Sequence, residues 1–270
     1  MVKVHHNTGM DPLQPLLGTT LMLMAHPDDE IIICGALMQH MQTAVVVFAT
    51  DGAPRHQNFW KQYPSRQAYA DVRREEARQA LALAGAQPLF LADRVPGGIA
   101  DQELFRNLPA AVAAVEQIVD EVQPQAILAP AYEGGHPDHD AACFIASVVG
   151  RRRRVAVWES PLYHRRADGT FAMQTFPHLS GAEVDLAVPG EALAIKTRMF
   201  AAYRSQNLVL EQFHPERETF RPVFAYDFTR PPLPGKLNYE LWQWTMTGLE
   251  VSAAFAAYLE TAARGASPSQ

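Results

Sequence analysis

Short apolar runs alternate with helical patterns along the first half of the chain. Continuous apolar runs of this kind are typical of strands that are buried on both faces. They lie at residues 21–25, 44–49, 89–91, 126–129 and 155–158. Helical patterns fill the intervals at residues 31–41, 68–84 and 101–122. This alternation predicts βαβ units, and we expect an α/β fold of the Rossmann-like kind, with a mostly parallel β-sheet and helices on both faces.

The second half of the chain is less regular. Residues 159–188 contain several prolines and glycines and are predicted to form loops with short strands. Helical patterns return at residues 191–203 and 238–263, on either side of the breaking segment RPPLPG at 230–235. Neither a repeat nor a clear linker divides the sequence, so residues 1–270 are expected to form a single domain.

The composition is that of an ordinary folded globule, and it argues against several classes of partner. Apolar residues make up 48% and charged residues 19% of the 270 residues. The formal net charge is −6, so the chain lacks the basic face that a nucleic-acid-binding protein needs. The apolar stretches are far shorter than the roughly 20 residues that span a membrane, and the N-terminus lacks the apolar region of a signal peptide. We expect a cytoplasmic protein without a nucleic-acid or membrane partner.

Two further features of the composition are interpreted as structural. Cys34 and Cys143 are too few for a disulfide framework, which favours a reducing compartment. We interpret both as small core residues. The four arginines at 151–154 have two interpretations, an anion site and a solvated turn between a helix and the fifth strand, and we favour the second.

The sequence AHPDDE at residues 25–30 places candidate chemistry directly after the first predicted strand. In open α/β sheets, this edge of the sheet binds ligands. The adjacent carboxylates of Asp28 and Asp29 repel each other, and a nearby cation offsets that cost. His26 and Asp29 are three residues apart, which can aim both side chains at one point, whereas Asp28 lies to one side. The motif therefore predicts a metal ion close to Asp28.

A second polar motif, GGHPDHD at residues 134–140, follows the fourth predicted strand. The first and fourth strands of a doubly wound sheet are commonly neighbours, so both motifs are expected to face one crevice. One histidine of this motif would complete, with His26 and Asp29, the three-ligand set of catalytic zinc. A water bound to zinc has its pKa lowered to about 7 and attacks a carbonyl. Asp28 is placed to take its proton, and the remaining histidine to stabilise the oxyanion.

Other signatures of catalysis are missing from the sequence. No G-x-G-x-x-G follows the first predicted strand, and the chain has no P-loop, no G-x-S-x-G and no H-E-x-x-H. A nucleotide-binding oxidoreductase therefore lacks its glycine fingerprint.

Together, the two motifs resemble the PIG-L-like (LmbE-like) zinc-dependent de-N-acetylases. Two further segments fit this resemblance: Arg73-x-x-Glu76 with Ala80 and Gly85, and Lys196 followed by AAYRSQ at residues 201–206. The resemblance covers about residues 20–207. It implies a single domain of this family, on which a C-terminal extension of residues 208–270 packs.

The family's roles carry over by position in the two motifs. Three residues match the metal ligands: His26, Asp29 and His139. The resemblance implies that Asp28 is the general base and that His136 polarises the carbonyl and stabilises the oxyanion. It also implies that the carboxylate of Asp138 orients His136.

Two positions have more than one interpretation. Arg73 matches a substrate-binding residue of the family, although an ion pair with Glu76 on the helix surface explains it equally well. Some members of the family carry a tyrosine two residues before the first histidine of the second motif, and this chain has Gly134 there. Tyr132 and Tyr163 are the candidates to replace that tyrosine.

The resemblance implies a zinc-dependent N-deacetylase. It would remove an acetyl group from an N-acetylated amino sugar, such as N-acetylglucosamine, or from its conjugate, by attack of a metal-bound water. The implied cofactor is Zn²⁺, although two histidines and a carboxylate also suit Fe(II). The alternative is a non-catalytic sugar- or metal-binding module on the same fold, and Asp28, which need not bind metal, favours the enzyme. Specificity is expected from the loops at 53–66, 93–100 and 159–188; the oligomeric state is left open.

Overall fold

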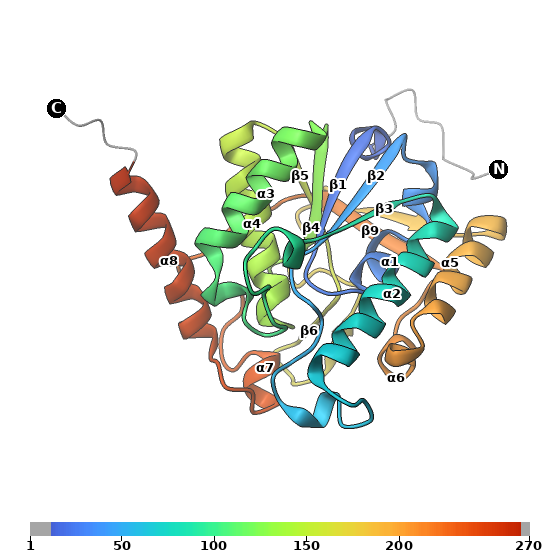
Figure 1. The fold of residues 1–270 in the computed structure, drawn as a ribbon. Coiled ribbons are helices and arrows are strands. Elements are labelled where there is room, and N and C mark those ends of the chain that lie inside the picture. Colours follow the sequence, from blue (N-terminus) through green and yellow to red (C-terminus); the bar gives the residue numbers. More distant parts are fainter. Residues whose placement is uncertain (1–11, 266–270) are drawn as a thin grey trace.

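A seven-stranded sheet forms the centre of the computed structural model, which describes residues 12–265 (Figure 1). In spatial order, its strands are β3 (Gln87–Phe90), β2 (Thr43–Phe48), β1 (Thr19–Met24), β4 (Ala126–Pro130), β5 (Ala156–Ser160), β9 (Arg217–Pro222) and β8 (Val184–Ala187). Strands β1 to β5 are parallel, and β9 and β8 are antiparallel. The prediction of a mostly parallel, Rossmann-like sheet is confirmed. The N-terminal segment in which we found no targeting signal lies outside the described residues.

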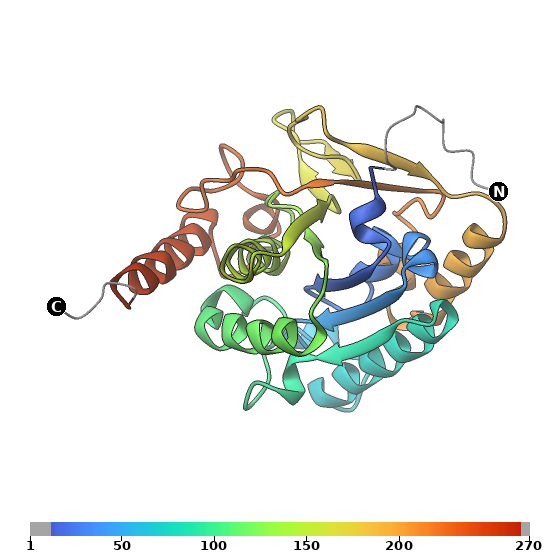
Figure 2. The ribbon, with the colours of Figure 1, turned by 90° about the horizontal axis from the view of Figure 1, so that it is seen from above.

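Helices cover both faces of this sheet. They are α1 (Asp29–Cys34), α2 (Arg66–Ala84), α3 (Leu108–Val122), α4 (Pro137–Arg153), α5 (Gly190–Ala202), α6 (Asn207–Leu210), α7 (Asn238–Leu241) and α8 (Gly248–Gly265). In Figure 1, α3, α4 and α8 lie on one side of the strands, and α1, α2 and α5 lie on the other. Figure 2 shows the arrangement from above, with the red α8 on the outside of its layer.

The position of β1 inside the sheet explains why its sequence is apolar without interruption. Leu21 and Leu23 belong to the core beneath α3, α4 and α8, whereas Met22 and Met24 belong to the core beneath α1, α2 and α5. Successive side chains of a strand point to opposite faces, and both faces are covered here. All four residues are fully buried.

The helical pattern at residues 31–41 forms two short pieces instead of one helix. α1 is followed by a 3-10 helix at Leu37–His40. The carboxylate of Glu218, on β9, accepts hydrogen bonds from the backbone N–H groups of Ala36 (2.7 Å) and Leu37 (3.0 Å). These groups bond to a side chain from a distant strand, so the α-helical ladder does not continue.

The predicted helix at residues 101–122 is wrong over its first seven residues, because α3 begins only at Leu108. Upstream of α3, the backbone N–H groups of Gln102 and Leu104 donate hydrogen bonds to the carboxylate of Asp138, at 2.6 and 2.9 Å. A side chain from α4 therefore keeps this segment out of the α-helix, and only a 3-10 helix forms there, at Leu104–Arg106.

The predicted helix at residues 238–263 is divided into α7 and α8. The backbone N–H of Thr247 donates to Glu250 Oε2 (2.7 Å), and the N–H of Glu250 donates to Thr247 Oγ1 (3.2 Å). This reciprocal pair is the capping box that starts a new helix. The position of Thr247 therefore decides where α8 begins.

The chain beyond residue 208 builds part of both the sheet and one helical layer. β9 inserts between β5 and β8, and α8 packs on α4 through the stacked rings of Phe144 and Phe255, whose centroids are 4.5 Å apart. A separate antiparallel hairpin consists of β6 (Tyr163–Arg165) and β7 (Phe171–Met173). Within residues 12–265, no helix is both long and apolar enough to cross a membrane.

The cysteines are buried core residues as we expected, whereas the arginine run, predicted as a turn, belongs mostly to the end of a helix. Cys34 and Cys143 are buried and unpaired. Arg151, Arg152 and Arg153 form the last turn of α4, and Arg153 pairs with the exposed Asp120 at 2.7 Å. These arginines are solvated at a helix end, where positive charge is favourable.

Candidate active site

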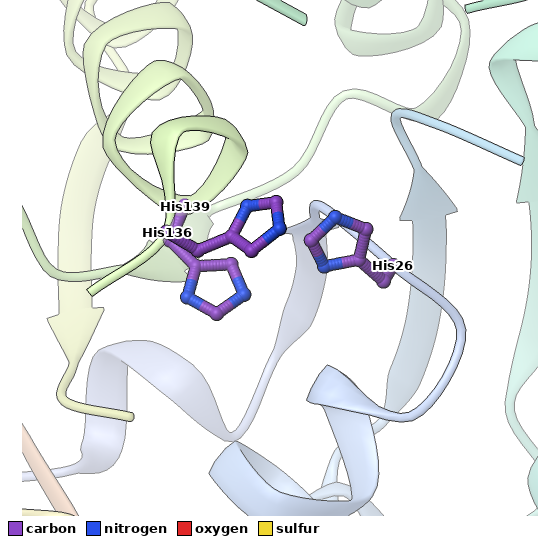
Figure 3. Close-up of side chains that lie close together, drawn as sticks. All are labelled: His26, His136 and His139. Atoms are coloured by element: carbon purple, nitrogen blue, oxygen red, sulfur yellow. The ribbon is translucent and has the colours of Figure 1, made fainter. Parts of the chain in front are cut away.

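The two polar motifs meet at the carboxyl ends of β1 and β4, which are hydrogen-bonded neighbours as the sequence predicts. His26 follows β1, whereas His136 and His139 lie at the start of α4, the next helix after β4. Figure 3 shows the three imidazole rings turned toward one another, with centroids between 4.4 and 5.2 Å apart. The topology of the sheet therefore brings together side chains that are far apart in the sequence.

The turn after β1 holds Asp28 in an unusual backbone conformation. Its φ is 119°, in a region that residues other than glycine rarely adopt. Two side chains of α1 fix the turn, because Asp29 accepts from the N–H of His26 (2.9 Å) and Glu30 accepts from the N–H of Asp28 (3.0 Å). Strain of this kind costs roughly 1–3 kcal/mol and is typical of functional sites.

Arg73, on α2, holds the carboxylate of Asp28, with 2.9 Å between Nη2 and Oδ2. Both side chains are buried. Burial raises the pKa of Asp28 to about 7, although the charge of Arg73 acts in the opposite direction. A pKa near neutrality suits a general base.

The structure corrects the interpretation of Arg73 as a surface partner of Glu76. Glu76 accepts hydrogen bonds from the backbone N–H (2.9 Å) and the hydroxyl (2.6 Å) of Ser205. Besides Asp28, Arg73 donates to the carbonyl oxygens of Gly52 (2.6 Å) and Pro27. Arg73 lines the cavity described below, and it anchors the turn that carries Asp28.

Asp29 lies between His26 and His139. Its Oδ2 is 3.6 Å from Nδ1 of His26, and its Oδ1 is 3.2 Å from Nε2 of His139. Ligand atoms arranged tetrahedrally at about 2.1 Å from a zinc ion lie roughly 3.4 Å apart, so each of these two spacings taken singly is compatible with binding to one ion. Burial acts to raise the pKa of Asp29, but the two histidines outweigh it and hold that pKa well below its usual range.

The other ring nitrogen of His26 faces two carboxylates. Its Nε2 is 3.3 Å from Asp101 Oδ1 and 3.2 Å from Asp138 Oδ2. A carboxylate on the second nitrogen is the usual arrangement around a metal-binding histidine. Potential ligand atoms of His26, His136 and His139 lie within 4.8 Å of one another, and so do those of His26, Asp101, His136 and Asp138. Asp29 belongs to neither group, so among the described residues the distances favour His136 over the predicted Asp29 as the partner of His26 and His139.

Asp101 is a residue of this site that the sequence analysis missed. Its Oδ1 lies 3.3 Å from Nε2 of both His26 and His136. Asp101 lies in a segment whose pattern predicts a helix, so the pattern gave no reason to place its side chain in the site. The signal in the sequence is the glycine pair at 97–98, a loop marker just upstream.

The expected contact between the Asp138 carboxylate and the ring of His136 is wrong. His136 is the N-cap of α4, and its Nδ1 accepts from the backbone N–H of Asp138 (3.1 Å), while its Nε2 faces Asp101. The Asp138 carboxylate contacts His26 and the loop at 102–104 instead. Burial and the nearby His26 lower the pKa of His136, which favours a neutral ring.

A cavity of about 410 Å³ opens beside these side chains. Its wall includes the three histidines, Asp28, Asp29, Arg73 and Asp101. Aromatic rings line much of the rest: Phe59, Tyr69, Tyr163, Phe171, Phe213, Trp242 and Trp244. Two of the three predicted specificity loops contribute, whereas residues 93–100 are not among the lining residues. The C-terminal extension supplies both tryptophans, and the ring centroid of Trp244 lies 4.9 Å from that of His136.

The structure distinguishes the two tyrosines considered as substitutes at Gly134. Tyr163 lines the cavity, with its ring centroid 5.5 Å from that of His139. Tyr132 lies in the core and donates to the carbonyl of Arg230 (2.6 Å). A side chain at Gly134 itself would be strained, because φ is 72° and its Cβ would lie 2.8 Å from Leu237.

The fold and the site define an α/β protein with a histidine–carboxylate centre at the carboxyl edge of its sheet. Residues 21–149 match the family described as PIG-L, GlcNAc-PI de-N-acetylase, so the resemblance seen in the motifs is confirmed. The matched segment contains both motifs. No curated protein matches the chain.

Solved structures share this fold at low sequence identity. The A40926 pseudoaglycone deacetylase Dbv21 is 19% identical, with a TM-score of 0.61, and the match covers 77% of this chain and 98% of that chain. A deacetylase–teicoplanin complex is 20% identical, with a TM-score of 0.56 and coverage of 77% and 98%. The N,N'-diacetylchitobiose deacetylase from Pyrococcus horikoshii is 18% identical, with a TM-score of 0.51 and coverage of 75% and 77%. At these identities, the likeness establishes the fold.

Proposed function

We propose that this protein is a metal-dependent hydrolase that removes an acetyl group from an N-acetylated amino sugar or its conjugate. The observation that carries the proposal is the convergence of Asp28, Asp29 and three histidines on one cavity. The match of the same segment to the PIG-L family supports it, as do similar structures that are described as deacetylases. We take the whole chain to act as one domain, because Trp242 and Trp244 complete the cavity of the matched segment.

His26, Asp29 and His139 would hold the ion, and zinc is our first expectation. This set is supported because the two oxygens of Asp29 face one nitrogen of each histidine, and the second nitrogen of His26 has carboxylate partners. His136 is the competing candidate, because its ring lies in one group with His26 and His139. Such an ion, when bound, supplies a Lewis acid that polarises a carbonyl and lowers the pKa of water. Fe(II) suits the same set of ligands.

The chain's own residues supply proton transfer and an oxyanion donor. Asp28 takes a proton from the water that adds to the acetamide carbon. Nδ1 of His136 accepts a backbone N–H, so the hydrogen of the neutral ring is on Nε2, which can donate to the carbonyl oxygen as negative charge develops. When the C–N bond breaks, the proton on Asp28 passes to the amine nitrogen. Acetate and a free amine then leave.

The aromatic wall supports a sugar or sugar conjugate as the substrate. Trp242 and Trp244 lie 5.2 Å apart by ring centroid, and Phe171 lies 6.0 Å from Trp242. Flat apolar faces with a few polar groups are what a ring-shaped ligand with an apolar side requires.

Amine release from N-acetylated sugars and their conjugates tests the proposal. The metal-reconstituted protein should release one amine and one acetate per turnover, and the chelated protein should release neither. The matched control is the Asp28→Asn protein loaded with the same metal. Saturable binding of these sugars without any amine release would support the non-catalytic module instead.

A further inference from the structure

The loop before α3 carries a polar side chain that the proposed mechanism does not use. Gln102 has a φ of 72°, in the left-handed region that favours glycine. The buried carboxylate of Asp138 holds its backbone, accepting from the N–H groups of Gln102 (2.6 Å) and Leu104 (2.9 Å). The same carboxylate contacts Nε2 of His26 (3.2 Å). Gln102 is therefore anchored to the candidate metal centre.

The conformation of Gln102 is costly for a residue with a side chain. Left-handed backbone costs a residue with a Cβ roughly 1–2 kcal/mol, so glycine would be more stable at this position. The side chain also makes no compensating contact through its donor group, because Nε2 is buried without a hydrogen-bond partner among the described residues. A buried N–H left unpaired adds to the cost. Folding stability thus gives no reason for a glutamine here.

The position of Gln102 shows what its side chain faces. It lines the cavity together with Asp101 and the three histidines. A ligand in this cavity would therefore lie beside the side chain of Gln102. A carboxamide presents both N–H donors and a carbonyl acceptor, and a hydroxyl group is likewise both donor and acceptor.

We propose that the side-chain amide of Gln102 binds a hydroxyl group of the substrate and so determines which amino sugars are accepted. This inference rests on the proposed function. In that mechanism, the acetamide carbonyl is directed toward His136 and the metal ligands, which leaves the ring hydroxyls for Gln102. The strained loop fixes the amide relative to the reacting carbonyl through Asp138.

The variant Gln102→Gly separates this role from a structural one. It removes the amide and relieves the backbone strain, so the melting temperature should stay the same or rise. KM should increase about 3- to 10-fold, the effect of losing one neutral hydrogen bond, while kcat changes by less than about 2-fold.

The matched control is Gln123→Gly. Gln123 is also a glutamine with positive φ (50°), but it is exposed at the C-terminal cap of α3. Its replacement should change stability in the same direction and leave both KM and kcat unchanged.

Substrates that lack one hydroxyl identify the group that Gln102 binds. The 3-, 4- and 6-deoxy derivatives of N-acetylglucosamine are compared with the parent sugar in the wild type and in Gln102→Gly. Removal of the hydroxyl bound by Gln102 should lower kcat/KM about 3- to 10-fold in the wild type and have no further effect in the variant, because the same hydrogen bond is already lost. Additive losses for every derivative would overturn the inference, and so would a variant with lowered kcat and unchanged KM.

The same series distinguishes this inference from the proposed function. If the wild type binds the sugars and releases no amine, the deacetylase proposal is wrong. The same comparison of parent and deoxy sugars in the two proteins, with Kd measured by calorimetry, then still decides the role of Gln102. If the wild type neither binds nor hydrolyses any of these sugars or their conjugates, both proposals are wrong.

Discussion

Asp28 combines three properties that point to proton transfer. Its backbone is held at a φ of 119° by hydrogen bonds within the turn. Its carboxylate is buried against Arg73. Burial raises its pKa to about 7, so it can exchange a proton near neutral pH.

The substitution Asp28→Asn should therefore abolish most turnover while the metal stays bound. An amide cannot accept the proton, and loss of a general base typically lowers the rate about 10²–10⁴-fold. Amine release and metal content, measured on the same protein, check this. Near wild-type turnover, or loss of the metal, would contradict the separate roles given to Asp28 and Asp29.

The histidines at the start of α4 should differ in what their loss does. His139→Ala should lose the metal, because its Nε2 shares Asp29 with His26. His136→Ala should retain the metal and lower kcat about 10²–10³-fold, as expected for an oxyanion donor. Elemental analysis decides between this assignment and a set in which His136 is a ligand. His214→Ala, at an exposed histidine, is the control.

Lys196 connects α5 to the segment after β1. Its Nζ is 2.8 Å from Glu218 on β9 and donates to the carbonyl of Ile32 (3.2 Å). Glu218 also accepts the backbone N–H groups that end α1. The side chains of Lys196 and Glu218 are both buried. Each therefore neutralises the charge of the other at a place that water does not reach.

Replacing Lys196 with Met should destabilise the fold strongly. Breaking a buried ion pair by removing one partner costs about 3–5 kcal/mol. Denaturant unfolding measures this, and the double variant with Glu218→Gln should recover part of the loss because no unpaired charge remains. A single variant as stable as the wild type would show that the pair does not hold these elements together.

The loop after β4 sets the place of the hairpin formed by β6 and β7. A Cβ at Gly135 would lie 1.9 Å from the carbonyl oxygen of Tyr163, which is backbone and cannot move alone. Gly169, in the hairpin turn, has a φ of 82° and no atom near its Cβ position. The two glycines are therefore required for different reasons.

The substitution Gly135→Ala should displace β6 and the cavity residue Tyr163. We expect a loss of roughly 1–3 kcal/mol of stability from overpacking together with reduced amine release. Gly169→Ala introduces backbone strain without a steric contact, so it should leave amine release unchanged. Equal activity of both variants would show that the contact of Gly135 with Tyr163 is not needed.

The molecule as a whole should not need a metal to fold. Two apolar cores, one on each side of the seven-stranded sheet, lie outside the candidate metal centre. Chelation should therefore abolish amine release and leave the circular dichroism spectrum unchanged, and added zinc should restore activity. The melting temperature should fall modestly, because the ion stabilises only by its binding free energy. Full activity after exhaustive chelation would refute the metal dependence.

The pattern of apolar residues predicted the five parallel strands well and the helix ends poorly. A strand such as β2, buried on both faces, is apolar throughout, so its own sequence shows it. The helices at 31–41, 101–122 and 238–263 begin or end elsewhere because of individual hydrogen bonds. Glu218 and Asp138 reach these segments from distant elements, and periodicity carries no information about such contacts.

The sequence by itself determined which side chains stand at the ends of β1 and β4, because each motif follows its strand directly and parallel strands end at one edge. It did not determine their partners. Asp101 between two histidines, Asp138 against His26, and Arg73 against Asp28 all join segments brought together by packing. The wall of tryptophans from the C-terminal extension arises in the same way. Local patterns specify the type and direction of an element, whereas contacts across the molecule depend on how all the elements pack against the sheet.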